Sequence, residues 1–315
     1  MYITSLLRRR VMAFSLALAA TVPLSGIAHA QNDGSKEKPL RVILIPADGG
    51  TEDGTKKDFQ PIFSAIEQST GLKFDIKVGQ NYSSVVEAMC NGAADIAWYG
   101  PASYLQARER GCAELLALAV RKGGSVYYSG IFARTDRGID SLSDLKGKRV
   151  ALGDVNSTSS FNVPVAMMIE AGVDPSRDLG GINLAGSHAN VLSALSEGLV
   201  DAGGASFDSF EKAVNSKAID PSMIKVVVKS LPLPYPPLAI HPGVEAGIKA
   251  TLRESFNKID KLPGISKEQI RGYGGTMVDG YNADVSEEDM AKAGKMFELV
   301  TDQVKEDIMK KAAKR

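Results

Sequence analysis

The chain has 315 residues, of which 44% are hydrophobic and 23% are charged, so it can bury a sizeable core and fold as one or two domains. Lysines and arginines total 37, as do aspartates and glutamates, and the formal net charge is zero. This balance argues against a nucleic-acid-binding protein that works through a broad basic face.

The first 30 residues differ from the rest of the chain. Three arginines at 8–10 precede an apolar stretch at 11–24, and Ala28-His29-Ala30 forms a small-x-small cleavage signal. A membrane anchor is the alternative, but the apolar stretch is short for a span. We therefore expect a signal peptide over residues 1–30, cleavage after Ala30, and a soluble protein in the periplasm. The arginine run leaves both Sec and twin-arginine export open.

Residues 40–120 alternate between predicted strands and helices. Apolar runs predict strands at 40–46, 74–79, 94–100 and 113–120, and helical spacing predicts helices at 59–71, 81–92 and 101–111, with a loop at 47–58. This alternation indicates an α/β fold with a parallel sheet covered by helices on both faces.

A strand at 126–134 leads out of this unit, and a second series follows. It comprises a strand near 149–153, the serine tract, a helix at 164–172, a strand at 182–186, a helix at 188–198 and a strand at 200–206. Prolines at 232–237 then forbid a central strand and suit a stiff crossing segment. We expect two lobes, and we expect the chain to cross from one to the other twice. Residues 31–128 begin lobe 1, 135–228 form lobe 2, and 236–315 complete lobe 1 with C-terminal helices.

Small polar side chains follow several of the predicted strands. The clearest case is GDVNSTSSFNVP (153–164), which brings a run of hydroxyls directly after an apolar strand. An ordinary turn is the alternative, because serine, threonine and asparagine are common turn residues. However, open parallel sheets bind ligands beyond the carboxyl ends of their strands, and helix N-termini there attract anions. Similar placements are found for Tyr82, His188 and Asp208, so the pattern favours an anion site.

The chain has two cysteines, Cys90 and Cys112. In an oxidising compartment such a pair is more often a disulfide than a metal site. Metal ligation would also require histidines nearby, and only His188 and His241 remain after signal cleavage. We expect a disulfide, no metal and no cofactor.

Three segments together resemble a known family. DIAWYGPASY (95–104), GDVNSTSSFNVP and GSHANVLSALSEGLVDAG (186–203) are similar to the phosphate/phosphite/phosphonate-binding group of periplasmic solute-binding proteins, which deliver ligands to ABC importers. The resemblance covers about residues 40–240. It implies a two-lobed periplasmic-binding-protein fold of type II that closes on its ligand by a hinge movement, and an ABC permease in the inner membrane as partner.

The resemblance also implies a ligand site. Matched motif by motif, the expected contacts to a small oxyanion are Tyr82, Tyr127, Ser157, Thr158, Ser159 and His188. In the aminophosphonate binders of this group, two acids hold the ligand's amine; one corresponds to Asp208, but the other would fall near Pro236, where no acid stands. This departure favours phosphite, phosphate or a simple phosphonate. Without the resemblance, the tyrosines would be packing residues, His188 a helix-cap histidine, and Asp208 a cap for a helix that begins at Ser209.

Two other classes of function are alternatives to a transport protein. Ser157, His188 and Asp208 have the residue types of a hydrolase triad, but the chain has no G-x-S-x-G elbow, P-loop or G-x-G-x-x-G sequence, so we do not expect an enzyme. The stronger alternative is a periplasmic sensor of an oxyanion such as arsenite, with a membrane histidine kinase as partner. The two cysteines keep this alternative open, because arsenite has a strong affinity for thiols.

Overall fold

The computed structural model describes residues 32–47 and 52–314, which belong to one compact unit, 31–315. The expected signal peptide and its cleavage site therefore lie outside the described residues. Within the described part of the chain, no helix is both long enough and apolar enough to cross a membrane.

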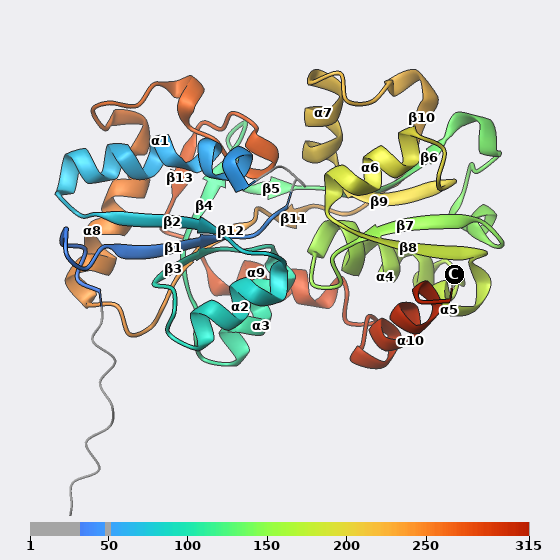
Figure 1. Cartoon of the computed structure of the whole chain (residues 1–315), viewed down its shortest axis with the longest axis horizontal. Helices are drawn as coiled ribbons and strands as arrows, with labels where there is room; N and C mark the ends of the chain where they lie inside the picture. Colours follow the sequence, from blue (N-terminus) through green and yellow to red (C-terminus); the bar gives the residue numbers. More distant parts are fainter. Residues whose placement is uncertain (1–31, 48–51, 315) are drawn as a thin grey trace, which may run out of the picture. The chain divides into compact units, whose positions relative to one another are not determined.

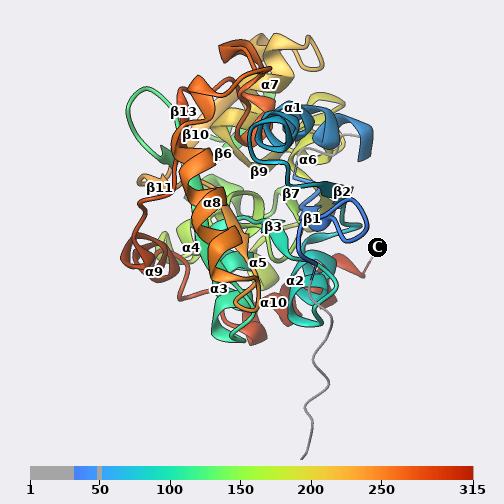
Figure 2. The same cartoon turned by 90° about the vertical axis from the view of Figure 1, so that its left-hand side faces the viewer.

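The first sheet has six strands (Figure 1). Its order is β13 (Gly280–Asn282), β4 (Glu114–Val120), β12 (Pro237–Ile240), β3 (Ile96–Trp98), β1 (Leu40–Leu44) and β2 (Phe74–Val78). It contains all the strands of the chain's first βα series, β1 to β4, together with β12 and β13. Its helices are α1 (Glu52–Thr70), α2 (Tyr82–Cys90), α3 (Pro101–Glu109), α8 (Ala246–Asn257) and α9 (Glu287–Lys295). In Figure 1, α1 lies above this sheet and α2 and α3 lie below it, and Figure 2 views the same half with α8 in front.

The second sheet has five strands and its own two helical layers (Figure 1). Its order is β10 (Ile224–Lys229), β6 (Ser129–Arg134), β9 (Ala202–Ser206), β7 (Arg149–Gly153) and β8 (Gly181–Gly186). Its helices are α4 (Val163–Glu170), α5 (Pro175–Asp178), α6 (His188–Ser196), α7 (Phe207–Asn215) and α10 (Asp302–Ala312). The two α/β halves that the alternating pattern predicted are thus both present.

Each sheet receives one antiparallel strand directly from a crossing segment. In the first sheet β12 lies antiparallel between β3 and β4, and in the second β6 lies antiparallel between β9 and β10. The two crossing segments also pair with each other, through β5 (Val126–Tyr127) and β11 (Leu233–Pro234). The order β2-β1-β3-β12-β4 in the first sheet therefore corresponds to β8-β7-β9-β6-β10 in the second. The loops that follow the carboxyl ends of β1, β3, β7 and β9 lie at the site described below.

The proline-rich segment corrects one expectation. Prolines at 232–237 predict that this segment contains no central strand, but β12 lies inside the six-stranded sheet. The reason is position: Pro237 is the first residue of the strand, where a missing N–H is tolerated, and Leu238–Ile240 supply the paired groups. Pro237 still contributes its carbonyl, which accepts a 2.9 Å hydrogen bond from the Tyr99 N–H.

Two element boundaries also differ from the expectations. The helix expected at 59–71 begins at Glu52, within the expected loop, because Thr55 and Phe59 lie on one buried face four residues apart. The expected single strand at 126–134 is divided at Tyr128 into β5 and β6, since the first part pairs with β11 and the second with β9 and β10.

The C-terminal helices belong to different sheets. Helix α9 contacts α3 and β11, whereas α10 contacts β8 and α5. Val300 and Ile308 are buried in the core of the second sheet, with Ile308 fully inaccessible. Burial of these two side chains explains why the chain passes to the second half once more, a crossing that the sequence pattern did not predict.

The core of the second sheet shows the period of two that a strand imposes. Val150 and Leu152 of β7 pack on one face with Phe161, while Ala151 packs on the other with Val191. Helices cover both faces, which holds the end of β7 and the serine tract after it in a fixed position.

Candidate functional site

The serine tract forms a tight, buried turn between β7 and α4. Ser157 caps a π-helical turn, Thr158–Asn162, and its Oγ accepts a 3.2 Å hydrogen bond from the Ser160 N–H. The four side chains from Ser157 to Ser160 are at most 1% exposed. Buried hydroxyls require hydrogen-bond partners, so the tract depends on groups that other elements bring to it.

Thr158 reaches across to the helix that follows β3. Its Oγ1 accepts a 2.8 Å hydrogen bond from the Ala102 N–H in the first turn of α3. Gly100 lies beneath this contact: a Cβ at Gly100 would stand 3.2 Å from Thr158 Oγ1 and 3.7 Å from Tyr82 Cε1. The glycine therefore lets the tract approach Tyr82 and the N-terminus of α3 closely.

The two predicted tyrosines both border the tract. Tyr82 is the first residue of α2, is 1% exposed, and its N–H donates to Asp154 Oδ2 at 3.4 Å. Tyr127 ends β5, and its hydroxyl hydrogen-bonds to the side chains of Ser159 and Thr158. Burial raises the pKa of the Tyr127 hydroxyl well above its usual range, which those hydrogen bonds only partly offset, so this hydroxyl keeps its proton.

His188 lies fully buried at the start of α6, where Ser187 is the N-cap. Its Nδ1 accepts a 3.1 Å hydrogen bond from the Ser206 N–H, the residue that caps α7. A neutral imidazole that accepts at Nδ1 carries its proton on Nε2. Nε2 is therefore a donor, and it lies 2.5 Å from Tyr273 Oη and 3.4 Å from Ser157 Oγ.

Two further tyrosines complete this cluster. Tyr273 lies in a short 3₁₀ turn, with its ring centroid 5.4 Å from that of Tyr127 and 5.8 Å from that of Trp98. Tyr235 follows β11, and its ring centroid lies 5.9 Å from that of Tyr127. Neither tyrosine is predicted as a site residue, since neither follows a predicted strand; the local signal for Tyr273 is the glycines that flank it.

Asp208 lies in the first turn of α7 and is 4% exposed. The helix is capped by Ser206 and begins at Phe207, so Asp208 is not the cap of a helix that begins at Ser209. Its Oδ1 lies 3.0 Å from Arg121 Nη1 and 3.4 Å from Tyr235 Oη. Burial raises the pKa of Asp208 to about 6, although Arg121 acts in the opposite direction.

The seven predicted contacts thus lie in one connected cluster, which Arg121, Tyr235 and Tyr273 extend. A surface hollow of about 320 Å³ lies elsewhere, between α6 and α7, and is lined by residues such as Ala189, Ser193 and Ala213. It contains none of the predicted contacts. The cluster differs from this hollow by its density of polar groups: hydroxyls, one imidazole donor and the N–H groups of helix first turns.

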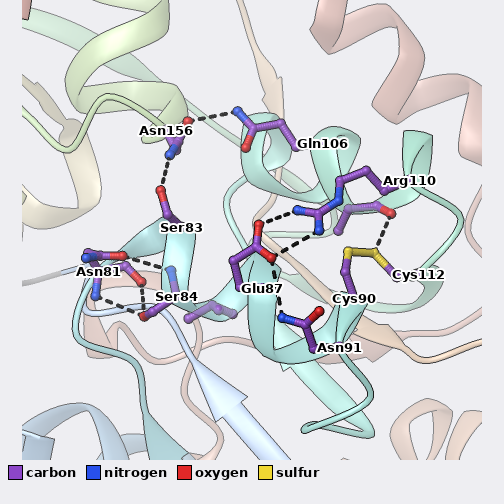
Figure 3. A network of polar contacts seen from close by, with 12 residues as sticks. Asn81, Ser83, Ser84, Glu87, Cys90, Asn91, Gln106, Arg110, Cys112 and Asn156 are labelled. Carbon is purple, nitrogen blue, oxygen red and sulfur yellow. Dashed lines mark hydrogen bonds and ion pairs between the residues drawn. A yellow bond between two sulfur atoms is a disulfide. The ribbon is translucent and has the colours of Figure 1, made fainter.

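A polar network on the outer side of the tract joins it to α2 and α3 (Figure 3). Asn156 Nδ2 donates to Ser83 Oγ at 2.7 Å, and Gln106 Nε2 donates to Asn156 Oδ1 at 2.8 Å. At the far ends of the same two helices, Cys90 and Cys112 are joined by the expected disulfide. The disulfide and the serine tract therefore hold opposite ends of the α2–α3 pair.

Comparison with known proteins agrees with the fold and the motifs. The family described as "ABC transporter, phosphonate, periplasmic substrate-binding protein" matches residues 50–270. The phosphate-import protein PhnD of Mycolicibacterium smegmatis is 32% identical over 231 residues, which are 69% of this chain and 71% of that protein. The phosphonates-binding periplasmic protein of Escherichia coli strain K12 is 27% identical over 254 residues, 79% of this chain and 74% of that protein.

A solved structure gives the same picture of the fold. PhnD1 from Prochlorococcus marinus, in complex with methylphosphonate, superposes with a TM-score of 0.73 at 19% identity. The match covers 84% of this chain and 98% of that one. The expected two-lobed periplasmic-binding-protein fold is thereby confirmed.

Proposed function

We propose that this protein, which belongs to the family of periplasmic substrate-binding proteins of phosphonate ABC transporters, captures a small phosphorus oxyanion and presents it to an ABC permease of the inner membrane. The ligand would be a phosphonate, phosphite or phosphate. The contacts to the oxyanion would be the six that the resemblance implies, Tyr82, Tyr127, Ser157, Thr158, Ser159 and His188, and Asp208 would lie in the wall of the same site.

The observation that carries this proposal is the convergence of uncharged donors from both lobes. Thr158 and the His188 Nε2–H come from the second lobe, and the Ala102 N–H and Tyr82 come from the first. A tetrahedral oxyanion has several acceptor oxygens that point in different directions. Donors on two facing lobes can satisfy them together, which couples binding to closure of the lobes.

The charge of the ligand would be met by helix N-termini. Four helices begin in or beside the cluster: α2 at Tyr82, α3 at Pro101, α6 at His188 and α7 at Phe207. Each contributes roughly half a positive charge at its N-terminus, together with N–H groups that its own turns leave unpaired. An anion can therefore be held without a lysine or arginine of its own.

The same geometry argues against hydrolysis. A serine nucleophile needs a base that accepts its proton at Nε2 and donates from Nδ1 to a carboxylate. His188 has the opposite arrangement, because Nδ1 accepts from the Ser206 N–H and Nε2 carries the proton. Asp208 is paired with Arg121 instead. These contacts support binding without turnover.

The sensor alternative gains no support from the relatives named above. Its strongest argument was thiol ligation of arsenite, and both cysteines are consumed by the disulfide. The relatives and the disulfide therefore favour transport over sensing.

Calorimetric titration tests the proposal directly. The purified protein should bind at least one of phosphite, phosphate and methylphosphonate, and should not bind arsenite. A protein that bound none of the three phosphorus compounds, or that hydrolysed a phosphate ester, would contradict it.

A further inference from the structure

Arg121 is fixed in position just after β4. Its backbone exchanges hydrogen bonds with Gly124 in both directions, at 2.8 and 3.1 Å, which closes a tight turn. Its guanidinium then reaches α7 in the other lobe, where Nη1 lies 3.0 Å from Asp208 Oδ1 and Nη2 lies 2.9 Å from Glu211 Oε2. One arginine thus joins two carboxylates that are three residues apart on one helix.

The two carboxylates differ in their surroundings. The Asp208 side chain is 5% exposed, whereas that of Glu211 is 52% exposed and that of Arg121 is 22% exposed. Glu211 therefore anchors the outer edge of the guanidinium, and Asp208 receives its inner edge. A planar guanidinium suits this double contact, because its N–H groups point in fixed directions.

Asp208 belongs to the wall of the oxyanion site. It stands two residues after Ser206, whose N–H fixes His188, and its Oδ1 contacts Tyr235 Oη. Gly274, next to Tyr273, packs on its other side: a Cβ there would lie 3.4 Å from the Asp208 backbone, and the φ of +69° also requires glycine. A group attached to a bound phosphorus atom would approach this carboxylate.

An isolated carboxylate in this wall would have two effects. It would repel an oxyanion in a poorly hydrated site, and it would attract any ligand that carries a cationic group. Arg121 removes both effects, because the pair is neutral and Asp208 Oδ1 is occupied.

We propose that Arg121 is a specificity-determining residue: by occupying Asp208 it restricts the site to phosphorus oxyanions that carry no cationic group. The inference rests on the proposed function and adds the chemical class of the ligand. It also assigns Asp208 a role in holding Arg121 across the two lobes, in place of a ligand's amine.

The test compares two ligands of similar size, methylphosphonate and 2-aminoethylphosphonate, by calorimetry on the whole purified protein. The wild type should bind methylphosphonate at least about tenfold more tightly. Arg121→Met keeps the length of the side chain and removes its charge, so this preference should shift by about tenfold or more towards the aminophosphonate.

Three further variants make the result specific. Arg121→Met combined with Asp208→Asn removes the freed carboxylate, so the shift towards the amine should disappear. Arg121→Lys retains the positive charge and should retain the wild-type preference. Glu211→Gln weakens only the outer anchor of Arg121 and leaves its contact with Asp208, so it should shift the preference less than Arg121→Met does.

The outcomes separate the two proposals. If the wild type binds the phosphorus oxyanions but prefers the aminophosphonate, the role of Arg121 is wrong and the proposed function stands, whatever the variants do. An unchanged preference in a folded Arg121→Met protein has the same meaning. If the wild type binds none of these ligands, both proposals fall.

Discussion

Thr158 Oγ1 accepts a hydrogen bond of 2.8 Å from the backbone N–H of Ala102, and this contact is one of several that join the two lobes at the site. The N–H groups in the first turn of a helix have no partner within the helix, so they must find one outside it. In α3 one of them is directed at the serine tract. Under the proposed function, a ligand oxygen would accept from this N–H and from the Thr158 hydroxyl in place of the contact between them.

Thr158 permits a matched pair of substitutions. Thr158→Val keeps the shape and removes the hydroxyl, so ligand affinity should fall by roughly ten- to a hundredfold, the value of a hydrogen bond to a charged group. Thr158→Ser keeps the hydroxyl and should retain most of the affinity. Calorimetry on both proteins decides this, and an affinity that Thr158→Val retains but Thr158→Ser loses would show that the methyl group matters rather than the hydroxyl.

His188 should hold its proton on Nε2. Because Nδ1 accepts from the Ser206 N–H, the imidazole can donate only from the other nitrogen while it is neutral. Nitrogen-15 NMR of the labelled protein at neutral pH should show an unprotonated Nδ1 and a protonated Nε2, with and without ligand. A proton on Nδ1 would contradict the donor role and would make the serine–histidine chemistry of a hydrolase worth testing again.

The serine tract and His188 could be predicted from the sequence because their signal is local. A polar run directly after an apolar strand and before a helix lies at the carboxyl edge of a parallel sheet, and the family motifs coincide with two such places. In the structure Ser157 Oγ lies 3.4 Å from His188 Nε2, although the two residues begin different helical segments. The two α/β halves were predictable for the same reason, since alternation of strands and helices is a property of short windows.

Arg121, Tyr235 and Tyr273 could not be assigned to the site from the sequence, although Arg121 follows the strand predicted at 113–120 and glycines flank Tyr273, because their partners lie far away in the chain. Tyr273 comes from a turn between C-terminal elements, and it meets His188, 85 residues away, only through the fold. The central position of β12 escaped prediction for a related reason: the proline rule describes a whole segment, whereas the sheet uses only the four residues at its end. Long-range pairing decided each of these cases.

Asn156 should affect closure rather than direct contact with the ligand. It bonds to Ser83 of α2 and Gln106 of α3, on the outer side of the tract. Asn156→Ala should therefore raise the ligand's dissociation rate several-fold and leave the association rate nearly unchanged, since partly exposed hydrogen bonds are worth about 1 kcal/mol each. Stopped-flow measurement checks this.

Gln106→Ala provides the control for that prediction. It removes one of the same two bonds, so its effect should be smaller, and the double variant should be less than additive because the two residues share a contact. Additive effects would show that Asn156 acts through some other group.

The disulfide should stabilise the fold without affecting the site. It closes a segment with a sequence separation of 22, for which the chain-entropy model gives about 3 kcal/mol. The double variant Cys90→Ser with Cys112→Ser should unfold at a lower denaturant concentration but bind ligand with unchanged affinity, since the disulfide lies at the ends of α2 and α3 remote from the tract. Two free thiols in the unfolded, non-reduced wild type would contradict the pairing.

Asp208 should give the protein a measurable dependence of stability on pH. Burial raises its pKa from an ordinary 3.8 to about 6 in the folded protein, so the folded state binds this proton more tightly than the unfolded chain does. Its stabilising contribution is then complete below about pH 3.8 and is lost as the pH rises through about 6. The melting temperature of the wild type relative to Asp208→Asn should therefore fall between about pH 4.5 and pH 7.5.

Asp220 is a matched control, because hydrogen bonds from Ser222 lower its pKa. Its carboxyl group is ionised across this pH range in both the folded and the unfolded protein. The difference in melting temperature between the wild type and Asp220→Asn should therefore not change with pH. A wild type that gains stability relative to Asp208→Asn as the pH rises would show that the attraction of Arg121 outweighs the burial of the carboxyl group.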